Sequence, residues 1–168
     1  MEPDEQALDE FLVGRRGRLF RSAYLLCGDR DEAEDLVQTT LVKVILGWRR
    51  LERIDNVEAY ARRTLVNVFI ASRRRMWRRE RPHGELPERP QAGHDADLSL
   101  TVRAALAALP VRQRTVLVLR YWEDMSVEAT AAALGMREGT VKSHSSRGIA
   151  ALRQSLPAGL DEVGRAWT

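Results

Sequence analysis

The chain has 168 residues, enough for one ordinary domain or two small ones with modest cores. Its 27 Lys and Arg nearly balance its 24 Asp and Glu, so overall charge alone indicates no polyanionic partner. The single cysteine, Cys27, excludes an internal disulfide, the three histidines lack metal-ligand spacing, and no apolar run is long enough to span a membrane. We therefore expect a soluble cytoplasmic protein without metal, cofactor or membrane insertion, in which Cys27 is a core residue.

The first predicted element is an amphipathic helix that follows Asp29. Asp29 and Glu32 form a plausible capping pair at its start. Apolar positions then recur with a helical period. We expect the core-facing side chains to be Ala33, Leu36, Val37, Thr40, Leu41, Val44 and Ile45. The exposed face of this helix is a polar strip of Glu34, Asp35, Gln38 and Thr39. From the residues alone, we favour a solvent-exposed surface over a binding site for this strip.

A second, longer helix is predicted from near Asn56, and it ends in a strongly basic run. Six arginines crowd into positions 73–81, with Trp77 among them. Arginine neutralises phosphate and an aromatic ring stacks on an unpaired base, so this run suits single-stranded or distorted nucleic acid. For Trp77 a partly buried anchor is an equally good interpretation. The predicted core-facing residues are Val57, Tyr60, Ala61, Thr64, Leu65, Val68 and Phe69, and the adjoining face carries Arg63, Asn67 and Arg74.

Residues 81–97 have the composition of a linker. They contain three prolines, two glycines and almost no large apolar side chain. Proline disfavours helix, so we expect an extended segment that joins two separate blocks.

Beyond the linker, helices are predicted over 98–109, ended by Pro110, and over 111–122, with Val116, Leu119 and Trp122 spaced for a core. Strand-like alternation persists nowhere in the sequence. The fold class is therefore predicted to be all-α, with two small helical domains joined by a flexible linker.

The stretch from Ser126 to Leu156 reads as a helix-turn-helix. Ser126 is a good N-cap, and Gly135 sits where the first helix must stop in a left-handed conformation. In the second helix the inward stripe is predicted to be Val141, Ile149 and Leu152. The opposite face carries Lys142, Ser143, Ser146 and Arg147, which are side-chain types that contact base edges and phosphates. A merely solvated face is the alternative, but the complete pattern favours DNA binding.

Four stretches in order, 28–41, 59–75, 108–126 and 139–147, resemble the bacterial extracytoplasmic-function sigma factors, the small two-domain specificity subunits of RNA polymerase. The resemblance covers nearly the whole chain. It implies a region 2-like domain over 1–80, the linker over 81–97, a region 4-like domain over 98–156 and a tail over 157–168 without an assigned role. It also implies a promoter-specificity factor that is not itself an enzyme.

The resemblance assigns residues to three tasks. Core RNA polymerase would dock on Asp35, Leu36, Val37 and Gln38. The downstream (−10) promoter element would be recognised and melted by Tyr60, Arg63, Asn67, Arg73, Arg74 and Trp77, near a pocket lined by the 48–56 loop. The upstream (−35) element would be read by Arg137, Thr140, Lys142, Ser143, His144, Ser146 and Arg147.

Three positions depart from the commoner family pattern. Arg137 replaces a small capping residue, Thr130 replaces a larger aliphatic one, and Ser145 replaces leucine or isoleucine. The resemblance further suggests an anti-sigma factor as an inhibitory partner. The competing hypothesis is a free-standing helix-turn-helix regulator that binds DNA as a dimer; it leaves the polar strip and the arginine run unexplained.

Overall fold

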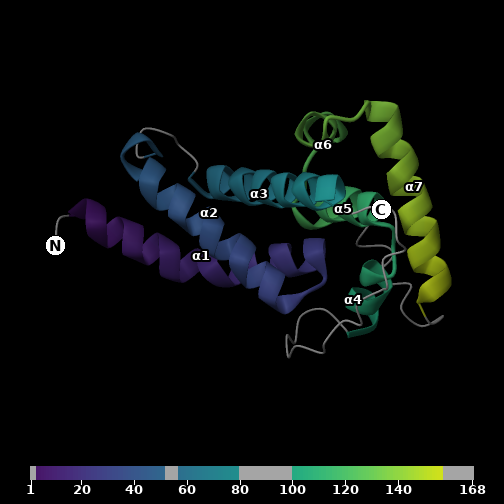
Figure 1. Ribbon diagram of the computed structural model, residues 1–168, viewed down its shortest axis with the longest axis horizontal. Coiled ribbons are helices and arrows are strands. Elements are labelled where there is room, and N and C mark those ends of the chain that lie inside the picture. Colours follow the sequence, from purple (N-terminus) through teal and green to yellow (C-terminus); the bar gives the residue numbers. More distant parts are fainter. Residues whose placement is uncertain (1–2, 52–56, 80–99, 157–168) are drawn as a thin grey trace. The chain divides into compact units, whose positions relative to one another are not determined.

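The computed structural model describes residues 3–51, 57–79 and 100–156, and every regular element in these ranges is a helix (Figure 1). The predicted linker over 81–97, the tail over 157–168 and residues 52–56 of the predicted 48–56 loop lie outside these ranges, whereas residues 48–51 belong to a helix. The chain divides into two compact units, Met1–Glu85 and Leu86–Thr168. The predicted all-α fold class is confirmed.

The first unit consists of three long helices, α1 (Pro3–Cys27), α2 (Arg30–Leu51) and α3 (Val57–Arg79). The chain reverses between α1 and α2 at Gly28, whose φ of 74° is a conformation that glycine adopts without steric cost. As predicted, Asp29 caps α2: its Oδ1 accepts a hydrogen bond of 2.8 Å from the backbone N–H of Glu32. Figure 1 shows α1 and α2 lying side by side with opposite directions.

Helix α1 was not among the predicted elements. Its sequence interrupts the apolar pattern with Gly14, Gly17 and several arginines, so propensity and periodicity are both weak there. Tertiary packing compensates, because Leu19, Ala23 and Leu26 are buried in the core of the unit.

The buried face of α2 follows the predicted register, with one exception. Ala33, Leu36, Val37, Thr40 and Val44 are all buried, and Leu41 is half-buried. Ile45 is 44% exposed, so the prediction that it faces the core was wrong. Helix α3 contributes further buried residues to the core of this unit, Ala61, Thr64, Leu65, Val66 and Phe69.

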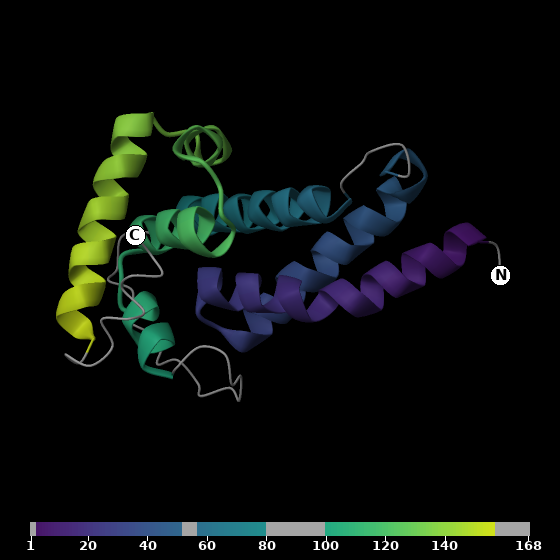
Figure 2. The ribbon, with the colours of Figure 1, turned by 180° about the vertical axis from the view of Figure 1, so that it is seen from behind.

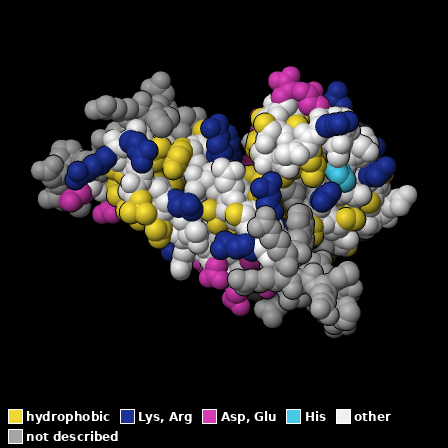
Figure 3. Space-filling model, turned by 45° about the horizontal axis from the view of Figure 1, so that its top comes forward, with side chains coloured by type: hydrophobic (Ala, Val, Ile, Leu, Met, Phe, Trp, Pro, Cys, Tyr) yellow, Lys and Arg dark blue, Asp and Glu magenta, His cyan; other side chains and the backbone are white. Residues whose placement is uncertain are grey.

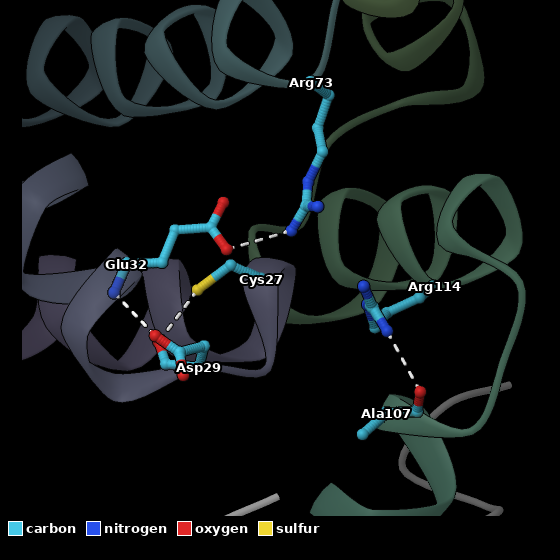
Figure 4. Close-up of polar contacts among 6 residues, drawn as sticks. All are labelled: Cys27, Asp29, Glu32, Arg73, Ala107 and Arg114. Atoms are coloured by element: carbon cyan, nitrogen blue, oxygen red, sulfur yellow. Dashed lines mark hydrogen bonds and ion pairs between the residues drawn. The ribbon is translucent and has the colours of Figure 1, made fainter. Parts of the chain in front are cut away.

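Cys27 is a core residue at the end of α1. Its Sγ donates a hydrogen bond of 3.1 Å to the backbone carbonyl of Asp29 (Figure 4). Burial raises the pKa of this thiol to about 12, so it remains protonated and unreactive at neutral pH.

The second unit contains α4 (Leu100–Ala107), α5 (Val111–Leu117), the π-helical turn η1 (Val118–Trp122), α6 (Val127–Leu134) and α7 (Glu138–Ser155). Pro110 precedes α5 and takes the extended conformation that begins it. The single helix predicted over 111–122 thus changes to a wider π turn in its last five residues. The buried Arg114 donates from Nη1 to the carbonyl of Ala107 at 3.1 Å and so satisfies the C-terminal end of α4 (Figure 4).

The helix-turn-helix has the predicted local chemistry. Ser126 caps α6 by accepting the N–H of Ala129 at 3.0 Å. Gly135 ends α6 in the left-handed region with a φ of 62°, and the turn leads directly into α7 (Figure 2). A small core of Val116, Ala131 and Val141 joins α5, α6 and α7.

Small side chains let α7 pack closely on α5 and η1. A Cβ added at Gly148 would lie 2.8 Å from Cδ1 and 3.1 Å from Cγ of Leu117, which is fully buried. Ser145 is also buried, and its Oγ lies 3.2 Å from the hydroxyl of Tyr121 in η1. Neither residue belonged to the predicted inward stripe, whereas Val141 and Leu152 are buried as predicted and Ile149 is half-buried.

Two glycines of α7 provide a test of this packing. Gly139 is exposed, and a Cβ added there would meet only open space, so Gly139→Ala should raise the free energy of unfolding by up to about 1 kcal/mol through helix propensity. Gly148→Ala should lower it by about 1–3 kcal/mol, because the added methyl overlaps Leu117. Urea denaturation followed by circular dichroism measures both, and equal gains at the two positions would contradict the close contact.

Candidate functional site

The second helix of the helix-turn-helix, α7, presents a polar face opposite its buried stripe. Five of the predicted residues have exposed side chains on this helix: Thr140, Lys142, Ser143, Ser146 and Arg147. The helical register places them around the side opposite Val141 and Leu152. The face therefore combines hydroxyl donors and acceptors with two fixed positive charges, which suits contact with base edges and phosphates in a major groove.

Arg137 lies at the N-cap position of α7. It has the extended backbone of an N-cap, with φ −74° and ψ 148°, and its side chain makes no capping hydrogen bond. The side chain is exposed. The departure from a small capping residue therefore places an additional guanidinium at the start of the polar face.

His144 differs from its neighbours because it is only half-exposed. It lies between the polar face and the stripe that packs on α5. Its pKa is lowered from the ordinary value of 6.5 by burial, and further by the positive charges of Arg112 and Arg147. The imidazole is therefore neutral in the free protein at neutral pH.

In the first unit, α3 carries the predicted downstream-element residues on one stripe. Arg63, Asn67 and Arg74 are exposed, and Tyr60 is half-buried. Their spacing of three, four and seven residues keeps them on one side of the helix. Trp77 belongs to α3, but its side chain lies outside the described residues, so its two interpretations stay open.

Arg73 is placed differently from the prediction, which grouped it with exposed DNA-contacting residues. Its side chain is only 11% exposed and turns toward α2, where Nη2 pairs with Oε2 of Glu32 at 3.2 Å (Figure 4). The guanidinium also lies over the ring of Phe69, 5.2 Å from its centroid. These contacts make Arg73 a packing residue that joins α3 to α2.

The predicted polymerase-docking residues of α2 separate into two groups. Asp35 and Gln38 are exposed, as the polar strip required. Leu36 and Val37 are 4% and 0% exposed, so they support the helix from below and do not present side chains to a partner. Leu36 and Val37 are thus buried, as their apolar spacing predicted, and the docking role of the segment that contains all four residues stays a prediction.

Sequence reasoning missed three exposed apolar residues that continue the strip. Val42, Ile45 and Leu46 are 53%, 44% and 81% exposed, and their spacing from Asp35 and Gln38 places all five on one side of α2. A signal was present: the run at 41–46 contains more apolar residues than one face of a helix can bury. We call Asp35, Gln38, Val42, Ile45 and Leu46 the α2 stripe.

Within the described residues, no group of three or more His, Cys, Asp or Glu side chains is arranged to hold a metal ion. The same residues include no helix that is both long and apolar enough to cross a membrane.

Comparison with known proteins identifies the family to which the chain belongs. Residues 12–79 match the family described as Sigma-70 region 2, and residues 99–152 match Sigma-70, region 4. The chain is 41% identical over 157 residues to an RNA polymerase sigma-E factor of Streptomyces coelicolor, a match that covers 89% of this chain and 86% of the relative. The chain belongs to the sigma-70 family.

Further relatives place this sigma factor among the extracytoplasmic-function group. It is 33% identical to the ECF sigma factor SigL of Mycobacterium tuberculosis, over 82% of each chain. It also superposes on a solved structure of the sigma factor RpoE in complex with the anti-sigma factor NepR from Bartonella quintana. That match has a TM-score of 0.65 and 28% identity, and it covers 89% of this chain and 96% of the other.

The chain is thus a promoter-recognising RNA polymerase sigma factor, and the free-standing regulator is not favoured. A sigma factor works with core RNA polymerase and promoter DNA and performs no catalysis itself. The order of the matches along the chain, region 2 before region 4, assigns α1–α3 to region 2 and α4–α7 to region 4.

Arg73 and Arg74 are neighbours with opposite surroundings and form a matched pair for a stability test. Arg73→Gln should lower the free energy of unfolding by about 1–3 kcal/mol, since it leaves the largely buried Glu32 carboxylate without its guanidinium partner. Arg74→Gln alters an exposed side chain and should change stability by no more than about 0.5 kcal/mol. Thermal denaturation compares them, and similar losses at both sites would refute the structural role of Arg73.

Proposed function

We propose that this sigma factor divides its work among three described surfaces: the polar face of α7, the exposed stripe of α3 and the α2 stripe. One observation supports the proposal: each of the three helices buries one set of side chains in the core and exposes a different set on another side. The exposed side chains are therefore available to a partner without loss of packing.

The polar face of α7 is proposed to read the upstream promoter element. Lys142 and Arg147 supply donors for guanine edges or phosphates, and Ser143 and Ser146 supply short hydroxyls that fit close to the groove floor. Arg137 and Thr140 stand at the start of the helix, where a recognition helix approaches base edges. Since short side chains make few base contacts, DNA shape is expected to contribute to this readout.

The exposed stripe of α3 is proposed to hold the opened downstream element. Arg63 and Arg74 neutralise phosphates, and Asn67 offers both a donor and an acceptor to a base edge. Tyr60, half-buried near the start of α3, supplies an aromatic ring on which an unstacked base can rest. Extrusion of a base costs a few kcal/mol, which such stacking and hydrogen bonds offset. Arg73 is left out of this contact set because its guanidinium is held by Glu32.

The α2 stripe is proposed to dock on core RNA polymerase. Exposed Val42, Ile45 and Leu46 form an apolar surface of the kind that protein partners cover, and Asp35 and Gln38 add a polar edge that fixes orientation. Leu36 and Val37 act indirectly, by anchoring α2 on its own core.

We also propose that the protein acts in the cytoplasm, where bacterial RNA polymerase transcribes, and that an anti-sigma factor restrains it. The second point is supported by the similar sigma factor RpoE, whose solved structure is a complex with the anti-sigma factor NepR.

Core binding tests the α2 stripe directly. The double variant Asp35→Arg with Gln38→Ala, and separately Leu46→Glu, should each weaken binding to bacterial core RNA polymerase at least about tenfold, because they place charge or lose polar contacts within the docking surface. Val13→Glu is the matched control, since Val13 of α1 is 83% exposed but lies on another helix. Comigration on a sizing column measures the effect; equal loss in the control would argue against a specific stripe.

The role of α7 predicts a separable defect. Arg147→Ala should reduce transcription from promoters that the protein recognises by about tenfold, with no change in affinity for core, because it removes one charged DNA contact. In vitro transcription with reconstituted holoenzyme reports the first quantity and core titration the second. A parallel fall in core binding would contradict the assignment of Arg147 to DNA.

A further inference from the structure

Helix α1 contacts both the end of α2 and the start of α3. Phe11 of α1 packs on the ring of Trp48 near the end of α2, with 5.8 Å between the ring centroids. In the first turn of α3, the carboxylate of Glu58 pairs with two arginines of α1. Nη2 of Arg15 lies 3.2 Å from Oε2, and Nη1 of Arg18 lies 3.3 Å from Oε1. One helix therefore connects the two helix ends.

Tyr60 lies between these two helix ends. It follows Glu58 by two residues in α3, and its side chain is half-buried. A Cβ added at Gly47 of α2 would lie 3.5 Å from the hydroxyl oxygen of Tyr60 and 3.6 Å from Cδ1 of Leu51. The backbone of Tyr60 thus belongs to the start of α3, while its hydroxyl group lies beside the last turns of α2. The position of its ring depends on how these two helix ends are placed relative to each other.

The paired arginines fix the direction of Glu58 more than they stabilise the fold. Arg15 and Arg18 are three residues apart, so they lie on the same side of α1. Each takes a different oxygen of the carboxylate, which restrains its rotation. The side chains are 37–54% exposed, and ion pairs with this exposure contribute only about 0–1 kcal/mol to stability.

We propose that Arg15, Arg18 and Glu58 are positioning residues for the downstream promoter element. They place the start of α3 relative to α1 and α2, and so hold the ring of Tyr60 where an unstacked base can rest. The proposal rests on the stacking role proposed above for Tyr60 and extends it to α1, which has no other proposed part in promoter recognition. None of the three side chains has to touch DNA.

A simple charge effect predicts the opposite result for Glu58. Figure 3 shows dark-blue lysine and arginine side chains spread over one face of the molecule. Glu58→Gln removes a negative charge and leaves the guanidinium groups of Arg15 and Arg18 without their carboxylate. If charge alone mattered, this variant would bind DNA more tightly. The positioning role predicts weaker opening of the downstream element, so the sign of the effect distinguishes the two explanations.

The test uses holoenzyme assembled with the full-length protein and a promoter that it transcribes. The promoter carries 2-aminopurine in the downstream element, where fluorescence rises when a base leaves the stack. Glu58→Gln should reduce the opened fraction about fivefold through its coupling to Tyr60. An unchanged or larger opened fraction would overturn the positioning role.

Glu34→Gln is the matched control. It removes the same charge and breaks the 3.0 Å pair between Glu34 and Arg16, which joins α1 to α2 and does not involve α3. Glu34 lies outside the α2 stripe, and its pair has nearly the same exposure as those of Glu58. The opened fraction should stay within about twofold of wild type. A loss equal to that of Glu58→Gln would overturn the specific role of the start of α3.

A double variant tests whether Glu58 acts through Tyr60. Once Tyr60→Ala has removed the ring, adding Glu58→Gln should cause no further loss of opening, because there is no ring left to position. A direct DNA contact or a general structural defect would instead lower opening by the same factor in both backgrounds, and that result would refute the proposal. Circular dichroism verifies that the variants are folded.

These outcomes separate the positioning role from the proposed function. If Tyr60→Ala alone leaves opening unchanged, the stacking role of Tyr60 fails. If Tyr60→Ala reduces opening while Glu58→Gln does not, only the positioning role is refuted. Titration with core RNA polymerase, performed separately on each variant, ensures that the opened fractions are compared at equal holoenzyme concentration.

Discussion

The contact between α7 and α5 is the constraint on which the DNA-reading unit depends. Gly148 allows the two helices to approach until Leu117 occupies the space of a missing side chain, and Ser145 faces Tyr121 at the same crossing. This approach fixes the rotation of α7 about its own axis. Rotation in turn decides which side chains face outward, since a helix that buries Val141 and Leu152 must expose Ser143 and the residues beside it. The polar face is thus a geometric result of small residues on the hidden side.

In the region 2 unit, an ion pair determines which side chains face outward. The helices of this unit are long, and charge alone would expose every arginine at the basic end of α3 to solvent. Arg73 turns inward, pairs with Glu32 and covers Phe69, and this contact ties the basic end of α3 to the start of α2. Because one guanidinium is held in this way, the neighbouring Arg74 keeps a fixed outward direction. The exposed stripe of α3 and the α2 stripe therefore belong to one rigid arrangement of helices.

Local sequence signals predicted the elements whose ends carry specific chemistry. Asp29, Ser126, Gly135 and Pro110 each mark a helix boundary that the structure has, because capping and glycine conformations are local properties. Long-range packing was not predictable in this way. Helix α1 has weak periodicity, and Ile45 belongs to an apolar run that one face of a helix cannot bury completely. Arg73 lies among other arginines, and nothing near it in sequence indicates that it pairs with Glu32, 41 residues earlier. The π turn at Val118–Trp122 has no sequence signal that we can identify. The burial of the polar Ser145 is likewise explained only by its position beside the hydroxyl of Tyr121.

The separation of packing and DNA-facing positions along α7 has a consequence for how such proteins diversify. The core contacts of α7 come from buried residues, Val141, Ser145, Gly148 and Leu152. The proposed DNA contacts come from exposed residues that do not pack in the core, Lys142, Ser143, Ser146 and Arg147. Substitutions in the second set cost little stability, so a duplicated gene can change its promoter preference one residue at a time while the product stays folded. A lineage of sigma factors with distinct target genes can therefore arise on one scaffold, without an unstable intermediate between any two members.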